Sequence, residues 1–224
     1  MKKSSLILIA AFLLAGSYAG VAQETKGAWT TGADIFNRYN WRGSDFGNSP
    51  VVQPTIKYVD GGFTLGAWGS YSLSSTTTAT EADLFMTYAF KSGFSLTATD
   101  YYFPSEPGSV GHYFNYDKKK YQFFEISPAY INGKFTITGN YFFANSNNDI
   151  YVEAAYAFKT VNFFVGGGNW MYTKNMTSDF NLVNIGISTT KTLTVSDKLS
   201  IPLTGKVILN PDKEQIFFVF GFSF

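Results

Sequence analysis

Apolar and polar side chains alternate along most of the chain, in runs of about ten residues bounded by turn signals. The clearest runs are 63–73, 83–90, 135–143, 150–158 and 199–209. Short turns rich in Gly, Asn, Asp and Lys lie at 60–62, 91–93, 132–134, 159–161 and 196–198. Longer polar connections occupy 43–49, 74–80, 104–119, 174–179 and 210–214. The pattern predicts about twelve antiparallel β strands, with short turns at one end and long loops at the other.

Such a pattern is typical of an up-and-down outer-membrane barrel, although a soluble secreted β-sandwich or barrel also alternates. The composition of the last strand favours the outer-membrane barrel over the soluble protein. One of its faces carries Phe218, Phe220, Phe222 and Phe224. In water this face would be prone to aggregation, whereas a barrel pairs the last strand with the first and turns the face to lipid. We expect an all-β transmembrane barrel over residues 23–224 in contact with outer-membrane lipid. The four phenylalanines also resemble the C-terminal signal that barrel assembly machinery recognises.

The first 22 residues have the features of a secretory signal peptide. Lys2 and Lys3 precede an apolar run over 6–15 that is too short to span a bilayer. Small residues at Gly20 and Ala22 suit cleavage before Gln23. We therefore expect residues 1–22 to be removed on export, and the barrel to reside in the outer membrane of a Gram-negative bacterium.

Composition narrows the alternatives. Aromatic residues make up 19% of the chain and charged residues only 15%, which argues against a disordered chain. There is no cysteine, so a disulfide scaffold and a cysteine-ligated zinc site are excluded. The net charge is +1, and loss of Lys2 and Lys3 with the signal peptide leaves 15 basic against 16 acidic residues, a net charge of −1. The chain therefore lacks the basic excess of a nucleic-acid-binding protein.

Several short motifs carry a family resemblance. They are Asn37-Arg38-Tyr39-Asn40-Trp41-Arg42-Gly43, Asp45-Phe46-Gly47-Asn48-Ser49-Pro50, Gln53-Pro54, Gly66-Ala67-Trp68-Gly69-Ser70 and Glu81-Ala82-Asp83. Together they resemble the TorF-type porin family of bacterial outer-membrane proteins, most densely over residues 30–105. The resemblance implies an outer-membrane β-barrel. It supplies no established substrate and no catalytic residue.

The strand alternation predicts which charged side chains face the lumen. The first strand is expected to contribute Asp34, Arg38 and Arg42, and later strands Lys57, Asp83, Glu125, Glu153 and Lys206. Four basic and four acidic groups give a lumen without a dominant sign, unlike a strongly ion-selective pore. The charges either line a narrow aqueous pore or form ion pairs that fill the lumen. Arg38 and Arg42 are the best candidates for a functional contact, since guanidinium groups suit carboxylates and phosphates.

Three features leave alternatives open. Asp100 shares its phase with lipid-facing residues, so it lies near the rim or a bulge shifts the register. The glycines at 166–168 allow a bend, a plug or a close neighbour, with strand curvature favoured. The loop over 104–119 either folds inward as a constriction or lies in solvent with its lysines at anionic headgroups.

No arrangement of residues indicates catalysis. The only histidine, His112, has no serine and carboxylate partners in a recognisable order. The acidic residues Asp45, Asp100, Glu106 and Asp179 do not have the spacing of a calcium loop. We expect no enzymatic activity, no cofactor and no metal site.

The sequence thus favours a barrel through which small hydrophilic solutes diffuse passively. The alternative is a closed barrel that stabilises the envelope or binds a partner through its loops. A lumen packed by Phe36, Phe85 and Trp68 would favour that alternative.

Overall fold

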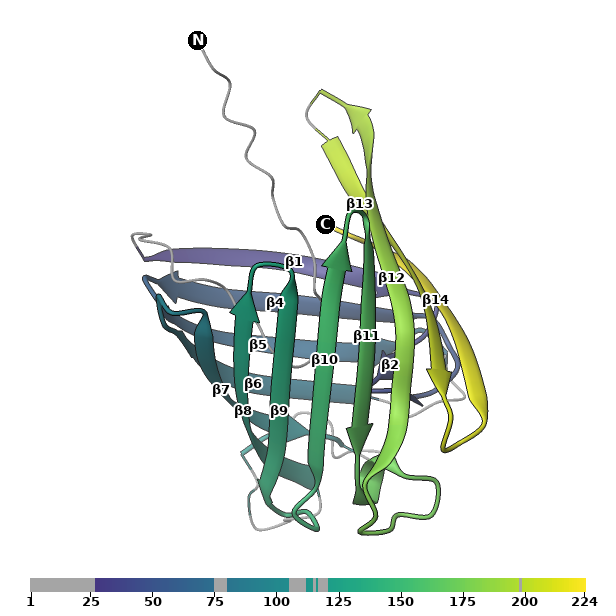
Figure 1. The fold of residues 1–224 in the computed structure, drawn as a ribbon. Helices are drawn as coiled ribbons and strands as arrows, with labels where there is room; N and C mark the ends of the chain where they lie inside the picture. Colours follow the sequence, from purple (N-terminus) through teal and green to yellow (C-terminus); the bar gives the residue numbers. More distant parts are fainter. Residues whose placement is uncertain (1–26, 75–79, 105–111, 115, 117–120, 198) are drawn as a thin grey trace.

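The computed structural model describes residues 27–224 except 75–79, 105–111, 115, 117–120 and 198. Its main feature is a single closed sheet (Figure 1). The barrel strands are β1 (Ala28–Phe36), β4 (Val51–Asp60), β5 (Phe63–Ser72), β6 (Thr80–Ala89), β7 (Phe94–Tyr102), β8 (Gln122–Asn132), β9 (Phe135–Ala144), β10 (Ile150–Phe158), β11 (Val161–Gly168), β12 (Asn181–Ser196), β13 (Leu199–Asn210) and β14 (Gln215–Ser223). The expected signal peptide, residues 1–22, lies outside the described residues.

Each strand pairs antiparallel with its neighbours in the chain, and β1 closes the barrel by pairing with both β4 and β14. At the closure Ile35 lies opposite Phe222 on one side and Val52 on the other. In Figure 1 the strands of the back wall run across those of the front wall, as tilted strands of a closed barrel do. The prediction of about twelve strands in an up-and-down antiparallel barrel is confirmed.

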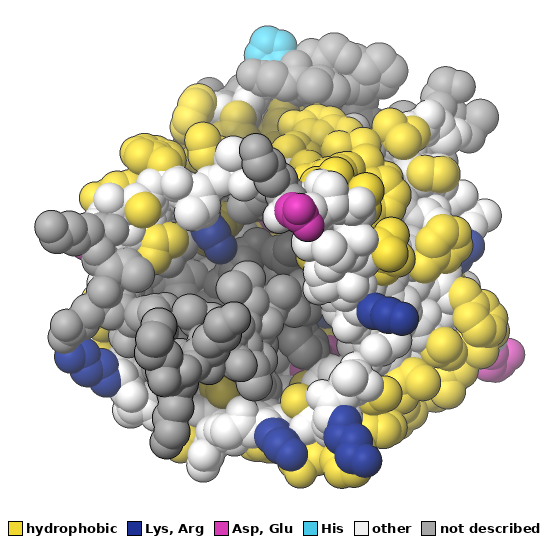
Figure 2. Space-filling view, turned by 90° about the horizontal axis from the view of Figure 1, so that it is seen from above, with side chains coloured by type: hydrophobic (Ala, Val, Ile, Leu, Met, Phe, Trp, Pro, Cys, Tyr) yellow, Lys and Arg dark blue, Asp and Glu magenta, His cyan; other side chains and the backbone are white. Residues whose placement is uncertain are grey.

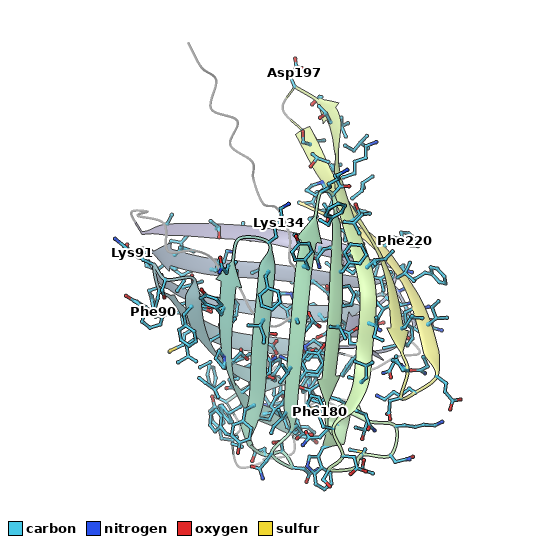
Figure 3. The ribbon with its side chains drawn as sticks, in the orientation of Figure 1. Phe90, Lys91, Lys134, Phe180, Asp197 and Phe220 are labelled. Atoms are coloured by element: carbon cyan, nitrogen blue, oxygen red, sulfur yellow. The ribbon has the colours of Figure 1, made fainter. Side chains whose placement is uncertain are left out.

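The outer face of the wall carries many exposed apolar side chains, and Figure 2 shows part of them around the periphery of the barrel seen from above. Its exposed middle positions are aliphatic: Leu65, Leu84, Met86, Leu96, Ile137, Val152, Val165, Ile187 and Leu209. Aromatic side chains flank them towards the short turns, at Phe63, Tyr88, Phe90, Phe94, Tyr130, Phe135, Tyr156, Phe158 and Phe163. Others lie near the loops, at Tyr71, Tyr141, Phe143 and Phe180. Figure 3 shows Phe90 and Phe220 on the outside of the wall, with Lys91 and Lys134 at the turn end.

The predicted phenylalanine face of the last strand points outward. Phe218, Phe220 and Phe224 are each more than 60% exposed, whereas Phe222 is half-buried. Their recognition by assembly machinery stays a prediction.

The hairpin of β12 and β13 projects beyond the rim at the turn end, where Figure 3 labels its tip at Asp197. Its outward side chains Leu193, Val195 and Leu199 are exposed there.

Asp100 lies on the outer face of β7, and the pairing of β7 with β6 and β8 has no bulge that would turn it inward. It is near the loop end, two residues before Tyr102, the last residue of its strand. The hydroxyl groups of Tyr113 and Tyr116 donate to its carbonyl and carboxylate oxygens, at 3.0 and 3.3 Å. Burial and the Asp100 carboxylate raise the pKa of Tyr113, so this hydroxyl stays a donor. The rim alternative for Asp100 therefore matches the structure.

No helix among the described residues is long and apolar enough to cross a membrane.

Candidate functional site

The chain enters the barrel immediately after β1. Residues 37–50, the inward segment, contain a small two-stranded hairpin formed by β2 (Asn40–Trp41) and β3 (Ser44–Asp45). Arg42 and Gly43 make its two-residue turn with φ of 49° and 81°, as a type I′ turn requires. A positive φ is uncommon for arginine, so neighbouring contacts must hold Arg42 in place. The prediction that Arg38 and Arg42 lie on the first strand is wrong, because β1 ends at Phe36.

Arg42, at the hairpin tip, is the centre of a buried polar cluster. Its guanidinium makes a two-pronged ion pair with Glu125 on β8, with Nη1–Oε2 at 2.5 Å and Nη2–Oε1 at 2.9 Å. It also donates to the Tyr172 hydroxyl and to Asn140 Oδ1, each at 2.6 Å. Glu125 is completely buried, and Tyr101 and Ser127 donate to its Oε1. Each charge is thus desolvated but fully partnered.

Aromatic packing surrounds this ion pair. Trp41 is 2% exposed, and its ring contacts those of Tyr101 on β7, Phe142 on β9 and Tyr172 in the β11–β12 loop. The Arg42 guanidinium lies 4.4 Å from the centre of the Trp41 ring, within range of a cation–π interaction. Tyr172 belongs to the short 3-10 helix η2 (Trp170–Tyr172).

Residues from β12, β13 and the loop after β13 also hold the hairpin. Asn210 at the end of β13 donates to the Gly43 carbonyl at 2.9 Å, and Lys213 Nζ donates to Ser44 Oγ at 2.9 Å. A side chain at Gly43 would collide with the carbonyl oxygen of Val183 on β12. Burial lowers the pKa of Lys213. Because its contacts come from β7, β8, β9, β12 and β13, the inward segment crosses the lumen near the loop end.

Arg38 lies at the base of the hairpin and is less tightly held than Arg42. Its Nη2 donates to Asn48 Oδ1 at 2.7 Å, and its Nη1 is 3.4 Å from Asp45 Oδ2. The side chain of Arg38 is 23% exposed, and its guanidinium lies over the Phe217 ring. Arg38 and Arg42 therefore have different carboxylate partners on the two sides of the hairpin.

A second polar cluster joins three further residues predicted for the lumen. Glu153 on β10 accepts hydrogen bonds from Tyr151 and Asn184, at 2.5 and 2.8 Å. Lys206 on β13 lies in the electrostatic field of Glu153 and Asp34. Its Nζ is 5.1 Å from the Phe36 ring centre. Lys57 on β4 shares the inward phase of Gln53 and Thr55 and is half-buried.

One inward carboxylate was not among the predicted lumen residues. Glu81 lies two positions before the predicted Asp83 on β6, and the two are only 2% and 5% exposed. The same alternation that predicts an inward Asp83 also predicts an inward Glu81, so this residue could have been found from the sequence. Because Arg38 and Arg42 lie in the inward segment, the strand positions that face the lumen are not balanced in charge, with Asp34, Glu81, Asp83, Glu125 and Glu153 against Lys57 and Lys206.

The glycines of β11 leave room for aromatic rings. A side chain at Gly166 would collide with the Tyr151 hydroxyl, and one at Gly168 would approach the Tyr172 ring within 2.6 Å. A bulge lies between Gly166 and Gly167 in the pairing with β12. Among the three alternatives of a bend, a plug and a close neighbour, the structure shows close neighbours. A bulge lies beside them.

The residues weighed for catalysis and for metal binding lie in different parts of the structure or outside its described residues. Asp45 is inside the barrel and Asp100 on its outer face, so these two carboxylates are separated by the wall. His112 is exposed, and Glu106 and Lys118–Lys120 lie outside the described residues. Within the described ranges, no group of three His, Asp or Glu residues is placed to hold a metal ion.

The described residues of the loop over 104–119 do not fold into the lumen, so they do not form the constriction that was one prediction for this loop. Tyr113 and Tyr116 bind Asp100 on the outer face, and Tyr113 packs on Tyr102 there. The inward segment takes that place instead. It can narrow or close the lumen, and the paired charges around it can interact with a passing solute.

No family model matches the chain, and no curated protein matches it. Among solved structures, a mutant of the porin from Rh. blastica is similar, with 12% sequence identity and a TM-score of 0.39. The similarity covers 78% of this chain and 55% of the porin chain, so this chain spans about half of the porin's length. The TorF-type resemblance of residues 30–105 stays a prediction.

Proposed function

We propose that the chain is an outer-membrane barrel of a Gram-negative bacterium that admits small hydrophilic solutes by passive diffusion, with the inward segment as its constriction. The membrane location is supported by the aliphatic outer band between two sets of aromatic side chains. Lipid would cover this band, whereas water would leave it as an aggregation-prone surface.

The observation that carries the transport proposal is the polarity of the inner wall. Beyond the inward segment, towards the turn end, the wall is lined by small polar side chains that include Thr87, Ser95, Thr97, Ser127 and Thr204. A polar inner wall suits a hydrophilic solute better than an apolar wall would, and this polarity supports a passage towards the turn end.

A closed barrel is the second candidate, and a specific observation favours it. Phe36, Phe85 and Trp68 are all at least 91% buried, in one cluster with Trp41 and Tyr101. The two candidates differ in one respect only, which is whether the docked inward segment leaves a path for solute.

Swelling of liposomes that contain the refolded protein tests the proposal. Isotonic sugars of increasing size are added, and the swelling rate is followed by light scattering. The proposal predicts swelling with the smallest sugars and a steep fall with size. Protein that is folded, as shown by heat-modifiable gel mobility, but admits no sugar would contradict it and favour the closed barrel.

A further inference from the structure

Two buried carboxylates of β6 stand apart from the ion pairs of the lumen. Glu81 and Asp83 project from the same face of the strand and are close enough to interact electrostatically. The two nearest arginines are engaged elsewhere, Arg42 with Glu125 and Arg38 with Asp45 and Asn48. Among the described residues, no ion pair involves Glu81 or Asp83, although the charge of Arg42 acts on Glu81.

The two carboxyl groups approach each other, and Glu81 approaches the Tyr39 hydroxyl, but three of their four oxygens have no well-formed hydrogen bond. Among the described residues, none with acceptable geometry reaches Oε1 or Oε2 of Glu81, or Oδ1 of Asp83. The other lumen carboxylates differ, since both oxygens of Glu125 are bonded and Glu153 accepts from two donors. Buried ionised groups are almost always paired, so Glu81 and Asp83 keep acceptor positions that the described part of the chain does not fill.

The surroundings indicate what that partner is. Tyr39 of the inward segment has its hydroxyl beside Glu81, and Trp68 lies opposite Asp83 in the strand register. The Tyr39 and Trp68 rings are in contact, with centres 5.7 Å apart. The Tyr39 hydroxyl and the carboxyl groups of Glu81 and Asp83 thus bring oxygens together, and oxygens are the ligands of hard cations.

We propose that Glu81 and Asp83 bind a small divalent cation, such as Ca²⁺, inside the lumen. Its charge would balance the two carboxylates, and the Tyr39 hydroxyl and water would complete its coordination. Because no third acidic side chain or histidine joins the site among the described residues, the ion is held loosely and exchanges. Cation preference of the pore follows from this site, and that consequence alone rests on the proposed function.

Terbium luminescence tests the site directly. Tb³⁺ replaces Ca²⁺ in oxygen-ligand sites and emits when a nearby tyrosine or tryptophan is excited, and here Tyr39 and Trp68 are adjacent. The refolded barrel in detergent is titrated with Tb³⁺, and Ca²⁺ is then added as competitor. We expect saturable emission that Ca²⁺ displaces, and an apparent Kd raised by about tenfold or more in the Glu81→Gln/Asp83→Asn double variant.

The matched control is Glu153→Gln, which removes a lumen carboxylate that already has protein partners. It should leave the Tb³⁺ affinity unchanged. Heat-modifiable mobility establishes that each variant is folded. Absence of saturable emission from the folded wild type, or equal affinity in the double variant, would overturn the site and leave a shared proton between the two carboxyl groups as the explanation of their pairing.

The same samples separate this inference from the proposed function. Reversal potentials under a salt gradient report ion preference if the wild type conducts. A silent barrel that still binds Tb³⁺ through Glu81 and Asp83 contradicts the transport proposal but not the cation site. A conducting barrel that does not bind Tb³⁺ contradicts the cation site but not the transport proposal.

Discussion

Replacement of Glu125 by glutamine should release the hairpin from the lumen wall. The variant keeps the size of the side chain and an oxygen that can accept from Tyr101 and Ser127, but it removes the charge that pairs with Arg42. Loss of one partner of a buried ion pair costs about 3–5 kcal/mol. Since Arg42 keeps its bonds to Tyr172 and Asn140, we expect the lower end of this range.

The barrel strands do not depend on this ion pair, so the cost falls on docking of the hairpin. About 3 kcal/mol corresponds to an increase on the order of a hundredfold in the undocked population. Trypsin reports that population, because it cleaves after arginine and Arg42 is only 7% exposed when docked. When docking is fast relative to cleavage, the cleavage rate follows the undocked fraction.

The assay is therefore limited trypsin digestion of the folded barrel, with the fragment ending at Arg42 measured by mass spectrometry. The Glu125→Gln variant should be cut there on the order of a hundredfold faster than wild type. Glu153→Gln is the control and should not change the rate. Equal cleavage of Glu125→Gln and wild type would refute the view that this ion pair anchors the hairpin.

Three further variants test other parts of the molecule. Trp41→Ala removes the aromatic centre of the docked hairpin at a cost of about 3–5 kcal/mol, and should increase trypsin cleavage and sugar-driven liposome swelling together. Gly43→Ala places a methyl group against the Val183 carbonyl at a positive φ, and should also undock the hairpin, with unchanged heat-modifiable mobility. Phe218→Lys puts a charge on the outer face, and should lower the free energy of unfolding in lipid vesicles by about 2–4 kcal/mol, whereas the same change at the loop residue Phe180 should cost less.

The barrel was predictable from the sequence because it depends on strand alternation and turn composition. Residues such as Leu84 and Met86 face outward, with Asp83 and Phe85 inward, as a period of two requires. Asp100 also follows this rule and stays on the outer face. Alternation does not show that Tyr113 and Tyr116 cover it, because they come from a loop without a repeating pattern.

The inward segment was not predictable from alternation, which placed Arg38 and Arg42 on the first strand. A local signal was present in Arg42-Gly43, since glycine in a two-residue turn between Trp41 and Ser44 suits a hairpin. The partner of Arg42, by contrast, depends on contacts with distant strands. Glu125 is 83 residues away in the chain, and one sequence does not reveal that pairing.

The central claim is that the inward segment limits passage of polar solutes through the barrel. Its most direct test is single-channel conductance in planar bilayers, at several salt concentrations, of the wild type and of a variant with residues 38–48 replaced by a glycine-serine linker. The claim predicts small steps that rise with salt for the wild type, and much larger steps for the variant. Equal conductance of the two folded proteins would contradict it, as would a silent wild type beside a silent variant.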